Sequence, residues 1–482
     1  MQRDFESLLS ACRERKLNVC SDSRKVRAGD IFVAVPGVTE DGAKYIRQAF
    51  EGGALHVVCR SVPEECAQLP GEIFVLHPDP REALWRLAEA RWDTGNLPLK
   101  VLGITGTNGK TTCTYLLERL LTGLGHKVGV IGTVTYRWPG HSEPSPLTTP
   151  DPLSLHRMLG EMAVAGCDFA VMEVSSHSLA QQRVGGIPFA GAAFTNLTQD
   201  HLDFHENMEN YFTIKAKLFL EQPKIDKVKV INADDTWGRH LLELCPDALA
   251  FGREREFGQR RHLYGELLSA DTDGCRLRMH YGGKEWMLHS PLVGAFNASN
   301  LLLVQALALE IGVEPASLEI LSGFTGVCGR LEKIVNPLGL HVFVDYAHTP
   351  DALVNVLKSL RSAGFRRIIT VFGCGGNRDR GKRPLMGEAV AAFSDVAVLT
   401  SDNPRFEDPM AIIDDVLPGL GAARELIVEP DRRSATEKAL SIMKDGDALL
   451  IAGKGHEDYQ IVQGVKHHYS DQEVLRELMH CD

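Results

Sequence analysis

Residues 103–112 read GITGTNGKTT and stand between an apolar run and an amphipathic stretch. The run LKVLGIT (99–105) predicts a buried strand, and KTTCTYLLERLLTGLG (110–125) predicts a helix because its apolar residues recur every three to four positions. A glycine-rich turn from a strand into a helix brings backbone N–H groups and the positive end of the helix dipole close to an anion. The stretch therefore predicts an α/β sheet with a phosphate loop, formed by Gly106, Thr107, Asn108, Gly109, Lys110, Thr111 and Thr112.

The loop departs from the common phosphate-loop spacing. That spacing requires a glycine five residues before Gly109, where the chain has Ile104. Lys110 is nevertheless expected to reach the β and γ phosphates of a nucleotide, and Thr111 to hold Mg²⁺ through its hydroxyl. The alternative is a plain glycine-rich turn with a capping threonine, which the strand–loop–helix context disfavours.

The alternation of strands and helices predicts the domain organisation. The 482 residues suffice for about three domains. Short strands and helices mix up to residue 97, a βα rhythm with one hairpin follows, and the rhythm restarts after residue 329. We expect an α/β protein with a mixed α/β domain (1–97), a central domain of the P-loop ATPase type with a mostly parallel sheet (98–329) and a Rossmann-like domain (330–482).

Composition excludes several classes of protein. The net charge of −11 argues against nucleic acid or an anionic membrane as the main partner. No apolar run reaches the roughly 18 residues of a membrane span, and the N-terminus lacks the apolar core of a signal peptide. The eleven cysteines show no Cys-x-x-Cys spacing, so free thiols are expected. A cytoplasmic location follows as an expectation.

Side chains of the kind that bind metal ions follow two further predicted strands. Glu173 ends the strand in DFAVMEV, at the sheet edge where open α/β folds bind ligands, and its carboxylate is a suitable Mg²⁺ ligand. Four such residues crowd the next loop and suggest a second divalent cation: Asp200, His201, Asp203 and His205. The alternatives are an acid that caps a loop and a solvated polar loop.

Lys215 lies on the apolar side of a predicted helix, four residues after Tyr211 and four before Phe219. A buried ammonium group is costly unless it is paired or modified. A carboxylated amine would instead carry a negative charge and could bind a metal ion. The alternative is a side chain that extends its ammonium group to water.

Several motifs occur in a fixed order: TGTNGKTT, EVSSHSL, FTNLTQDHLDFH, YFTIKAKLF, FNASN, GRLE and DYAHTP. Together they resemble those of the Mur ligases, ATP-dependent enzymes that form amide bonds in peptidoglycan precursor synthesis. The resemblance extends over all three expected domains. DSRKVRAGDIFVAVPG near the start, with GCGGNRDRGKRPLMG, SDNPR and GKGHEDYQ near the end, favours the branch of the family that adds meso-2,6-diaminopimelate.

This resemblance implies roles for individual residues. It implies catalytic roles for Lys110, Glu173, His201 and Lys215, with Mg²⁺ ligands Thr111, Glu173, His201 and a carboxylated Lys215 (N6-carboxylysine). It implies that the phosphate loop binds ATP together with Asn297, Arg330 and Asp345. It assigns the UDP-linked substrate to Ser21, Ser23, Val38, Thr39, Glu40, Thr148, Thr149, Ser175, Gln181 and Arg183. Leu147 replaces an asparagine common in the family, so one hydrogen bond to substrate is expected to be missing.

Three charged loops of the C-terminal domain each follow a predicted strand: GGNRDR, SDNPR and GKGHED. Diaminopimelate differs from lysine by one distal carboxylate, which a guanidinium can grip through two parallel hydrogen bonds. Arg405 is expected to select the substrate, and Asp402 and Asn403 to receive ammonium groups. The whole expected pocket comprises Arg378, Asp402, Asn403, Pro404, Arg405, Gly453 and Glu457, with Pro404 fixing a turn.

The expected function is an ADP-forming amide ligase that uses ATP and Mg²⁺. It would add meso-2,6-diaminopimelate to the D-glutamate γ-carboxylate of UDP-N-acetylmuramoyl-L-alanyl-D-glutamate through an acyl phosphate. A monomer is expected, with small-molecule substrates and no nucleic-acid or membrane partner. The alternatives are an L-lysine-adding ligase, a folylpolyglutamate synthase and a nucleotide-binding switch. The switch would leave Lys215 and the third α/β domain unexplained.

Overall fold

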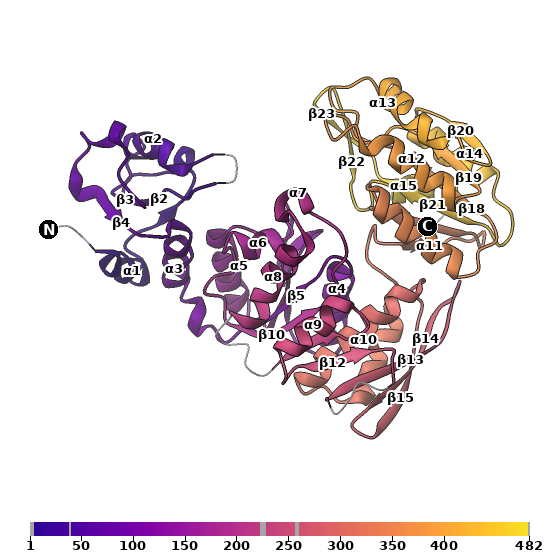
Figure 1. Cartoon of the computed structure of the whole chain (residues 1–482), viewed down its shortest axis with the longest axis horizontal. Coiled ribbons are helices and arrows are strands. Elements are labelled where there is room, and N and C mark those ends of the chain that lie inside the picture. Colours follow the sequence, from indigo (N-terminus) through magenta and orange to yellow (C-terminus); the bar gives the residue numbers. More distant parts are fainter. Residues whose placement is uncertain (1–3, 38–39, 222–227, 256–259, 481–482) are drawn as a thin grey trace. The chain divides into compact units, whose positions relative to one another are not determined.

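The computed structural model describes residues 4–37, 40–221, 228–255 and 260–480 (Figure 1). The chain divides into two compact units, Met1–Leu263 with Leu303–Glu314, and Tyr264–Leu302 with Pro315–Asp482. Within the described ranges, no helix has the length and apolar character needed to cross a membrane. The expected domain limits at residues 97 and 329 stay predictions.

The first unit begins with a small parallel sheet of four strands in chain order. These strands are β1 (Val19–Cys20), β2 (Ile31–Val33), β3 (His56–Cys59) and β4 (Phe74–Leu76). Helices α1 (Phe5–Arg13) and α3 (Pro80–Trp92) bury leucines on one face, and α2 (Ile46–Glu51) covers the other (Figure 1). Because both faces are covered, the short strands consist almost wholly of buried residues, as is usual for parallel sheets.

A larger sheet completes the first unit. The strands of this sheet that lie within the first unit have the order β12 (Leu249–Gly252), β11 (Lys229–Asn232), β10 (Phe189–Phe194), β5 (Lys100–Thr105), β9 (Phe169–Glu173), β6 (Val128–Ile131), β7 (Thr135–Trp138) and β8 (His141–Pro144). The strands from β12 to β6 are parallel, and β7 and β8 extend the sheet in antiparallel pairing. The connecting helices are α4 (Lys110–Gly123), α5 (Pro152–Val164), α6 (Ser176–Ala180), α7 (Leu202–His205), α8 (Met208–Leu220) and α9 (Thr236–Leu244).

The parallel pairing places four loops at one edge of this sheet. Ile104 pairs with Glu173, and Thr105 pairs with Phe194, so β5, β9 and β10 end at the same level. Ile131 pairs with Met172, which brings the end of β6 alongside. The phosphate loop is therefore flanked by the residues that follow β6, β9 and β10. This confirms the expected open α/β arrangement, and that ligands bind at this edge stays a prediction.

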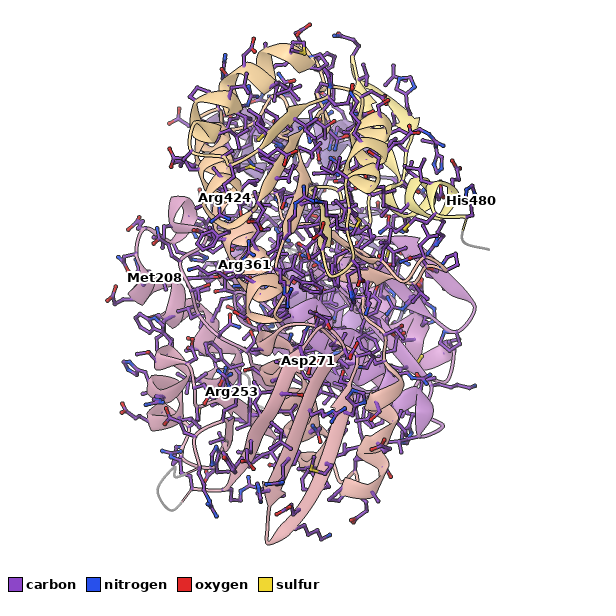
Figure 2. All side chains as sticks on the ribbon, turned by 90° about the vertical axis from the view of Figure 1, so that its right-hand side faces the viewer. Met208, Arg253, Asp271, Arg361, Arg424 and His480 are labelled. Carbon is purple, nitrogen blue, oxygen red and sulfur yellow. The ribbon has the colours of Figure 1, made fainter. Side chains whose placement is uncertain are left out.

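Most of the second unit's first segment is an antiparallel meander of β13 (His262–Asp271), β14 (Gly274–Tyr281) and β15 (Lys284–Ser290). Helix α10 (Ala295–Glu310) follows the meander, and its residues from Leu303 on belong to the first unit. Asp271, labelled in Figure 2, marks the end of β13. The sequence predicted only the hairpin around Gly282 and Gly283. Strand β13 escaped prediction because its exposed and buried residues do not alternate regularly and its register shifts near Ser269.

The last sheet has the order β16 (Glu332–Ile334), β17 (His341–Asp345), β21 (Ala448–Ala452), β18 (Ile368–Phe372), β19 (Val396–Leu399) and β20 (Leu426–Val428). All pairs are parallel except β16 with β17. Helices α11 (Pro350–Ser362), α12 (Lys382–Phe393) and α13 (Pro409–Val416) pack on one face. On the other face lie α14 (Arg432–Ser441) and α15 (Asp471–Leu478).

The three charged loops follow β18, β19 and β21, which are neighbours or next neighbours in this sheet. Phe372 pairs with Leu399, and Val371 pairs with Ile451, so these strands end together. A hairpin of β22 (Tyr459–Val462) and β23 (Val465–His468) follows the third loop. The arrangement confirms that one sheet edge gathers GGNRDR, SDNPR and GKGHED. All described cysteines are free thiols, as expected.

Candidate active site

The phosphate loop depends on two glycines with positive φ angles. Gly106 has a φ of 143°, and a Cβ atom there would collide with the hydroxyl of Thr195. Gly109 has a φ of 85° and precedes α4 without a side-chain capping hydrogen bond. Residues with side chains rarely adopt such angles, so glycine is needed at both positions. The N-terminus of α4 thus opens directly onto the loop, as an anion site requires.

Residues after β10 hold the loop from behind. Thr195 donates from Oγ1 to the carbonyl of Asn108 at 2.6 Å, and the N–H of Asn108 donates to Oδ1 of Asn196 at 2.9 Å. The N–H of Thr107 donates to the carbonyl of Asn196 at 2.9 Å. Sequence analysis gave these two residues no role, although they stand in the motif FTNL. Their contacts fix the loop's shape before any nucleotide is bound.

Two lysines donate to a single carbonyl oxygen. Nζ of Lys110 lies 2.9 Å from the carbonyl of Gly106 and 2.9 Å from that of Thr107. Nζ of Lys215, on α8, lies 2.8 Å from the same Gly106 carbonyl and 4.8 Å from the centre of the Tyr211 ring. Lys215 is only 1% exposed, so its ammonium group does not extend to water. Burial, and then the charge of Lys110, hold the pKa of Lys215 well below its ordinary value.

Glu173 lies at the end of β9 and is almost fully buried. Thr111 donates from Oγ1 to Oε2 of Glu173 at 3.0 Å. Thr133, which follows β6, donates to Glu173 through both its N–H at 2.8 Å and its hydroxyl at 3.0 Å. Sequence analysis missed Thr133, whose only signal was its place after a strand of the same sheet. The carboxylate and the Thr111 hydroxyl form a pair of hard oxygen donors, which suits Mg²⁺.

The histidines of the predicted cluster both lie near the ring of His177 but differ in exposure. The ring of His205 is buried, and its Nε2 lies 2.9 Å from the hydroxyl of Ser176. His201 is half exposed, with its Nε2 3.3 Å from a carboxylate oxygen of Asp200. The side chain of Asp203 lies outside the described part of the chain. Among the described residues, no group of three or more His, Cys, Asp or Glu side chains could hold a metal ion.

The residues predicted to meet the muramoyl dipeptide form one network beside Glu173. Thr149 donates from Oγ1 to the carbonyl of Glu173 at 2.9 Å and accepts from the N–H of Ser175 at 3.1 Å. Arg183 donates to the carbonyl of Thr149 at 3.0 Å and to Oε1 of Gln181 at 2.8 Å. The hydroxyl of Thr148 lies 3.3 Å from that of Thr133.

The residues predicted to contact uridine lie in the small N-terminal sheet region. Ser23 donates to Oε1 of Gln48 at 2.7 Å, and Glu40 accepts a hydrogen bond from the hydroxyl of Tyr45. Ser21 is exposed. Val38 and Thr39 lie outside the described residues.

Leu147 is 46% exposed. Its carbonyl accepts a hydrogen bond from the hydroxyl of Ser145 at 2.7 Å. The expected effect of this residue on substrate binding stays a prediction.

Three residues predicted to bind ATP lie in the second unit. Arg330 lies over the ring of Tyr346, with 5.1 Å from its guanidinium carbon to the ring centre, and its Nε has no hydrogen-bond partner among the described residues. Asp345 accepts from the N–H groups of Leu331 and Ala347. Asn297 is buried and donates to the carbonyl of Val293 at 2.9 Å. Their part in binding ATP stays a prediction.

The edge of the last sheet presents Arg405 and Arg378. Arg405 has a φ of 55° and donates from Nη1 to the carbonyl of Gly376 at 2.7 Å. Arg378 is exposed, and neither arginine forms an ion pair with any residue that the structure describes. The N–H of Glu407 donates to the carbonyl of Pro404 at 3.0 Å, which confirms the predicted turn.

The remaining residues of the expected pocket lie beside this turn. Nδ2 of Asn403 donates to Oε2 of Glu457 at 2.9 Å. Burial raises the pKa of the Glu457 carboxyl. A Cβ atom on Gly453 would lie 2.7 Å from Oδ2 of Asp402, so glycine is needed for the loop to pass that close.

Two fully buried arginines support this edge from behind. Arg383 donates to Glu407 at 2.9 Å and to Asp415 at 2.7 Å, and Arg432 grips Asp471 through Nε at 2.8 Å and Nη2 at 2.7 Å. Sequence analysis assigned neither, because an arginine inside a predicted helix carries no signal that distinguishes burial from exposure.

Comparison with protein families gives three consecutive matches. The model described as "Mur ligase family, catalytic domain" matches residues 18–92, "Mur ligase middle domain" matches residues 104–308, and "Mur ligase, glutamate ligase domain" matches residues 329–455. The matches follow one another in the order of the three segments expected from the sequence.

Individual relatives resemble the chain over nearly its whole length. The UDP-N-acetylmuramoyl-L-alanyl-D-glutamate–2,6-diaminopimelate ligase of Lawsonia intracellularis is 52% identical over 99% of both chains. A solved structure of a ligase of the same name is 33% identical, with a TM-score of 0.70 over 96% of this chain and 94% of the other. A folylpolyglutamate synthase of Mycobacterium tuberculosis, complexed with ADP, is 20% identical with a TM-score of 0.60 over 78% of this chain and 92% of the other, which shows a shared fold alone.

We predict that Lys215→Met stabilises the protein in the absence of nucleotide and bicarbonate. The Gly106 carbonyl keeps its bond from Lys110, whereas a costly buried amine is removed. Lys215 binds a proton more readily in the unfolded chain than in the folded protein, because burial lowers its pKa in the folded protein. The free energy of unfolding of the wild type therefore decreases as the pH falls from about 10 toward neutral. The midpoint of thermal unfolding should rise by about 2–4 °C at neutral pH, and by less at high pH.

The control is Lys217→Met on the same helix, where the lysine is 36% exposed and 3.5 Å from Glu221. That variant should unfold at the wild-type temperature. A Lys215→Met protein that unfolds earlier than wild type would contradict the account of this buried amine.

Proposed function

Because the chain belongs to the Mur ligase family, we propose that it joins meso-2,6-diaminopimelate to the D-glutamate of UDP-N-acetylmuramoyl-L-alanyl-D-glutamate. The reaction converts ATP to ADP and phosphate. The observation that carries this proposal is the 52% identity to a ligase of that name over 99% of both chains. Arg405 and Arg378, which form no ion pair with any described residue, present guanidinium groups at the sheet edge of the second unit and support the choice of amino acid.

The chemistry requires activation of a carboxylate, whose oxygen is a poor leaving group. An oxygen of the γ-carboxylate attacks the γ-phosphorus of ATP, so that the bond to ADP breaks and an acyl phosphate forms. The amine of diaminopimelate then attacks the acyl carbon, loses a proton and displaces phosphate. The enzyme contributes mainly positioning and neutralisation of charge, as in other phosphoryl transfers.

In the first unit, the phosphate loop supplies backbone N–H groups and Lys110 for the β and γ phosphates. Arg183, half-buried and within the network beside Glu173, would hold the anionic dipeptide near the loop. Asn297, Arg330 and Asp345 are proposed to hold the adenine, the phosphates and the ribose. Lys110 is already held at the loop by hydrogen bonds to the carbonyls of Gly106 and Thr107. Its side chain therefore loses little conformational entropy when ATP binds.

Thr111 and Glu173 would hold Mg²⁺, together with His201 and a modified Lys215. When bound, Mg²⁺ neutralises phosphate charge. The pairing of Thr111 with Glu173 at 3.0 Å supports this assignment, because both are oxygen donors of the kind Mg²⁺ prefers. The scarcity of further acidic or histidine ligands among the described residues is a reason to expect a ligand made by modification.

Lys215 has the properties that carboxylation requires. Its depressed pKa favours the neutral amine, whose lone pair can attack CO₂. An N–C bond forms, the nitrogen loses a proton, and the product carries one negative charge on two oxygens. The Tyr211 ring centre lies 4.8 Å from Lys215 and 6.4 Å from the His201 ring centre, so the modified side chain and His201 share a neighbour.

The alternative functions explain fewer of these observations. A nucleotide switch needs neither a buried lysine near the phosphate loop nor a gathered set of charged loops in a further sheet. A folylpolyglutamate synthase shares the fold, but it is only 20% identical to this chain in sequence. L-lysine lacks the distal carboxylate of diaminopimelate, so a ligase that adds L-lysine would have no distal carboxylate to place against Arg405 and Arg378. We further propose a monomeric enzyme in the cytoplasm that acts on small molecules.

Removing the amine of Lys215 should nearly abolish ligation. Lys215→Ala is expected to lower turnover at least about 100-fold, because a charged group near the transferred phosphate is lost. Added short carboxylic acids should restore part of the activity by supplying the missing oxygens. Formation of tripeptide and of ADP measures both effects, and Lys217→Ala serves as the control that keeps full activity. A fully active Lys215→Ala enzyme would rule out the proposed modification.

Removing Arg405 should affect the amino acid more than ATP. Arg405→Ala is expected to raise the KM for diaminopimelate by about 100-fold or more, since an ionic hydrogen-bonded pair contributes several kcal/mol. The KM for ATP should change less than about twofold. The wild type should use diaminopimelate and reject L-lysine, as competition between the two amino acids would measure.

The control is Arg424→Ala in the same unit. Arg424, labelled in Figure 2, is 78% exposed and pairs with Asp395 at 2.7 Å. It should behave like wild type. Equal use of both amino acids by the wild-type enzyme would refute the proposed substrate.

A further inference from the structure

Lys454 occupies the centre of the third charged loop without reaching solvent. Its side chain is fully buried. Nζ lies 2.8 Å from the carbonyl of Tyr459, 3.2 Å from Oδ1 of Asn403 and 3.8 Å from Oε2 of Glu457. A buried ammonium is costly, so its contacts must offset a large loss of hydration. Neither the family motifs nor the proposed mechanism gives this residue a role.

Lys454 and the hairpin together fix the orientation of one side-chain amide. Oδ1 of Asn403 accepts from Nζ of Lys454 and from the N–H of Ile461 at 2.9 Å. Nδ2 of Asn403 donates to Oε2 of Glu457 at 2.9 Å. If the amide turned over, its N–H₂ group would face two donors and its oxygen would face a carboxylate. All three hydrogen bonds would be lost, so the amide has one stable orientation.

This orientation determines what Asn403 can offer to a ligand. Its oxygen is already used by two internal donors, so it does not accept an ammonium group as the sequence suggested. Its N–H₂ group has two hydrogen atoms, and one of them is donated in a hydrogen bond to Glu457. Arg405, two residues further on, also presents N–H donors. The segment is therefore rich in donors, which suits a carboxylate and disfavours a second ammonium.

Resting on the proposed function, we propose that Lys454 is a positioning residue for amino-acid specificity. It holds the Asn403 amide with its N–H₂ group toward Glu457, so that the segment binds the distal carboxylate of diaminopimelate. The Glu457 carboxylate then serves as the acceptor for the distal ammonium. L-lysine has the ammonium without the carboxylate, so it gains only half of these contacts. Loss of Lys454 would remove one of the two donors that hold the amide oxygen, so the preference for this orientation, and with it the discrimination against L-lysine, would weaken.

The test begins with Lys454→Met, which keeps the length of the side chain and removes its charge and donors. We expect the KM for diaminopimelate to rise about tenfold, while the KM values for ATP and for the UDP-linked substrate stay within about twofold. The preference for diaminopimelate over L-lysine should fall by a similar factor. Lys466→Met is the matched control, because Lys466 is exposed in the same hairpin and lies over the Tyr459 ring. It should retain wild-type kinetics.

A double-mutant comparison separates this role from a purely structural one. If Lys454 acts through Asn403, the pair Lys454→Met with Asn403→Ala should have the same KM for diaminopimelate as Asn403→Ala alone. Additive losses would overturn the proposal, as would an unchanged amino-acid preference in Lys454→Met. If Lys454→Met does not fold, Lys454→Gln serves as the test variant. Its side chain keeps an N–H donor, so the variant should retain most of the preference for diaminopimelate over L-lysine. Complete loss of that preference would contradict the proposal.

The same assays distinguish a failure of the proposed role of Lys454 from a failure of the proposed function. A wild-type enzyme that does not ligate diaminopimelate refutes that function itself. A wild type that ligates diaminopimelate selectively, with Lys454→Met equally selective, refutes only the role of Lys454.

Discussion

The side chains of Lys110 and Lys215 both donate hydrogen bonds to one carbonyl oxygen, that of Gly106. The phosphate loop of the first unit depends on this close approach of two amines. Both Nζ atoms lie within 2.9 Å of the oxygen, and one of the lysines is buried. Burial, and then repulsion by the neighbouring ammonium group of Lys110, favour the neutral form of the Lys215 amine. A neutral lysine amine is a nucleophile, which is why we propose that Lys215 is carboxylated. The glycine at 106 and the hydroxyl of Thr195 behind it make this geometry attainable.

The second unit uses buried cations in a related way. Arg383, Arg432 and Lys454 are all fully buried, and each contacts residues from loops at the same sheet edge. A buried charge costs free energy and is weak evidence for added stability. What these cations provide is orientation: each holds a carboxylate or an amide in one position. The donors of the exposed Arg378 and the half-buried Arg405 then lie at an edge whose loops are held in place by buried cations, which suits selective binding of a small dipolar molecule.

Much of this arrangement could be predicted from the sequence, and the failures have physical causes. The strand, loop and helix around Gly106 follow from apolar spacing and glycine positions. The spacing of Tyr211 and Phe219 placed Lys215 on an apolar helix face, but it left open whether the ammonium group reaches water. The register of the strands explains the unusual loop: Ile104 is a buried strand residue paired with Glu173, so no glycine is needed there. By contrast, the role of Thr133 depends on which strand lies beside β9. The direction of the Asn403 amide depends on Lys454 and Ile461, which are some fifty residues away in sequence. Such tertiary partners leave no local pattern.

The central claim is that Lys215 becomes a negatively charged metal ligand in the working enzyme. Carbon-13 NMR of the protein in ¹³C-labelled bicarbonate with ATP analogue and Mg²⁺ tests it directly, because the modification adds one carbon that no other residue carries. We predict a single protein-bound carbamate resonance in the wild type and in Lys217→Met, and none in Lys215→Met. A fully active wild-type enzyme without that resonance, or a resonance that persists in Lys215→Met, would contradict the account.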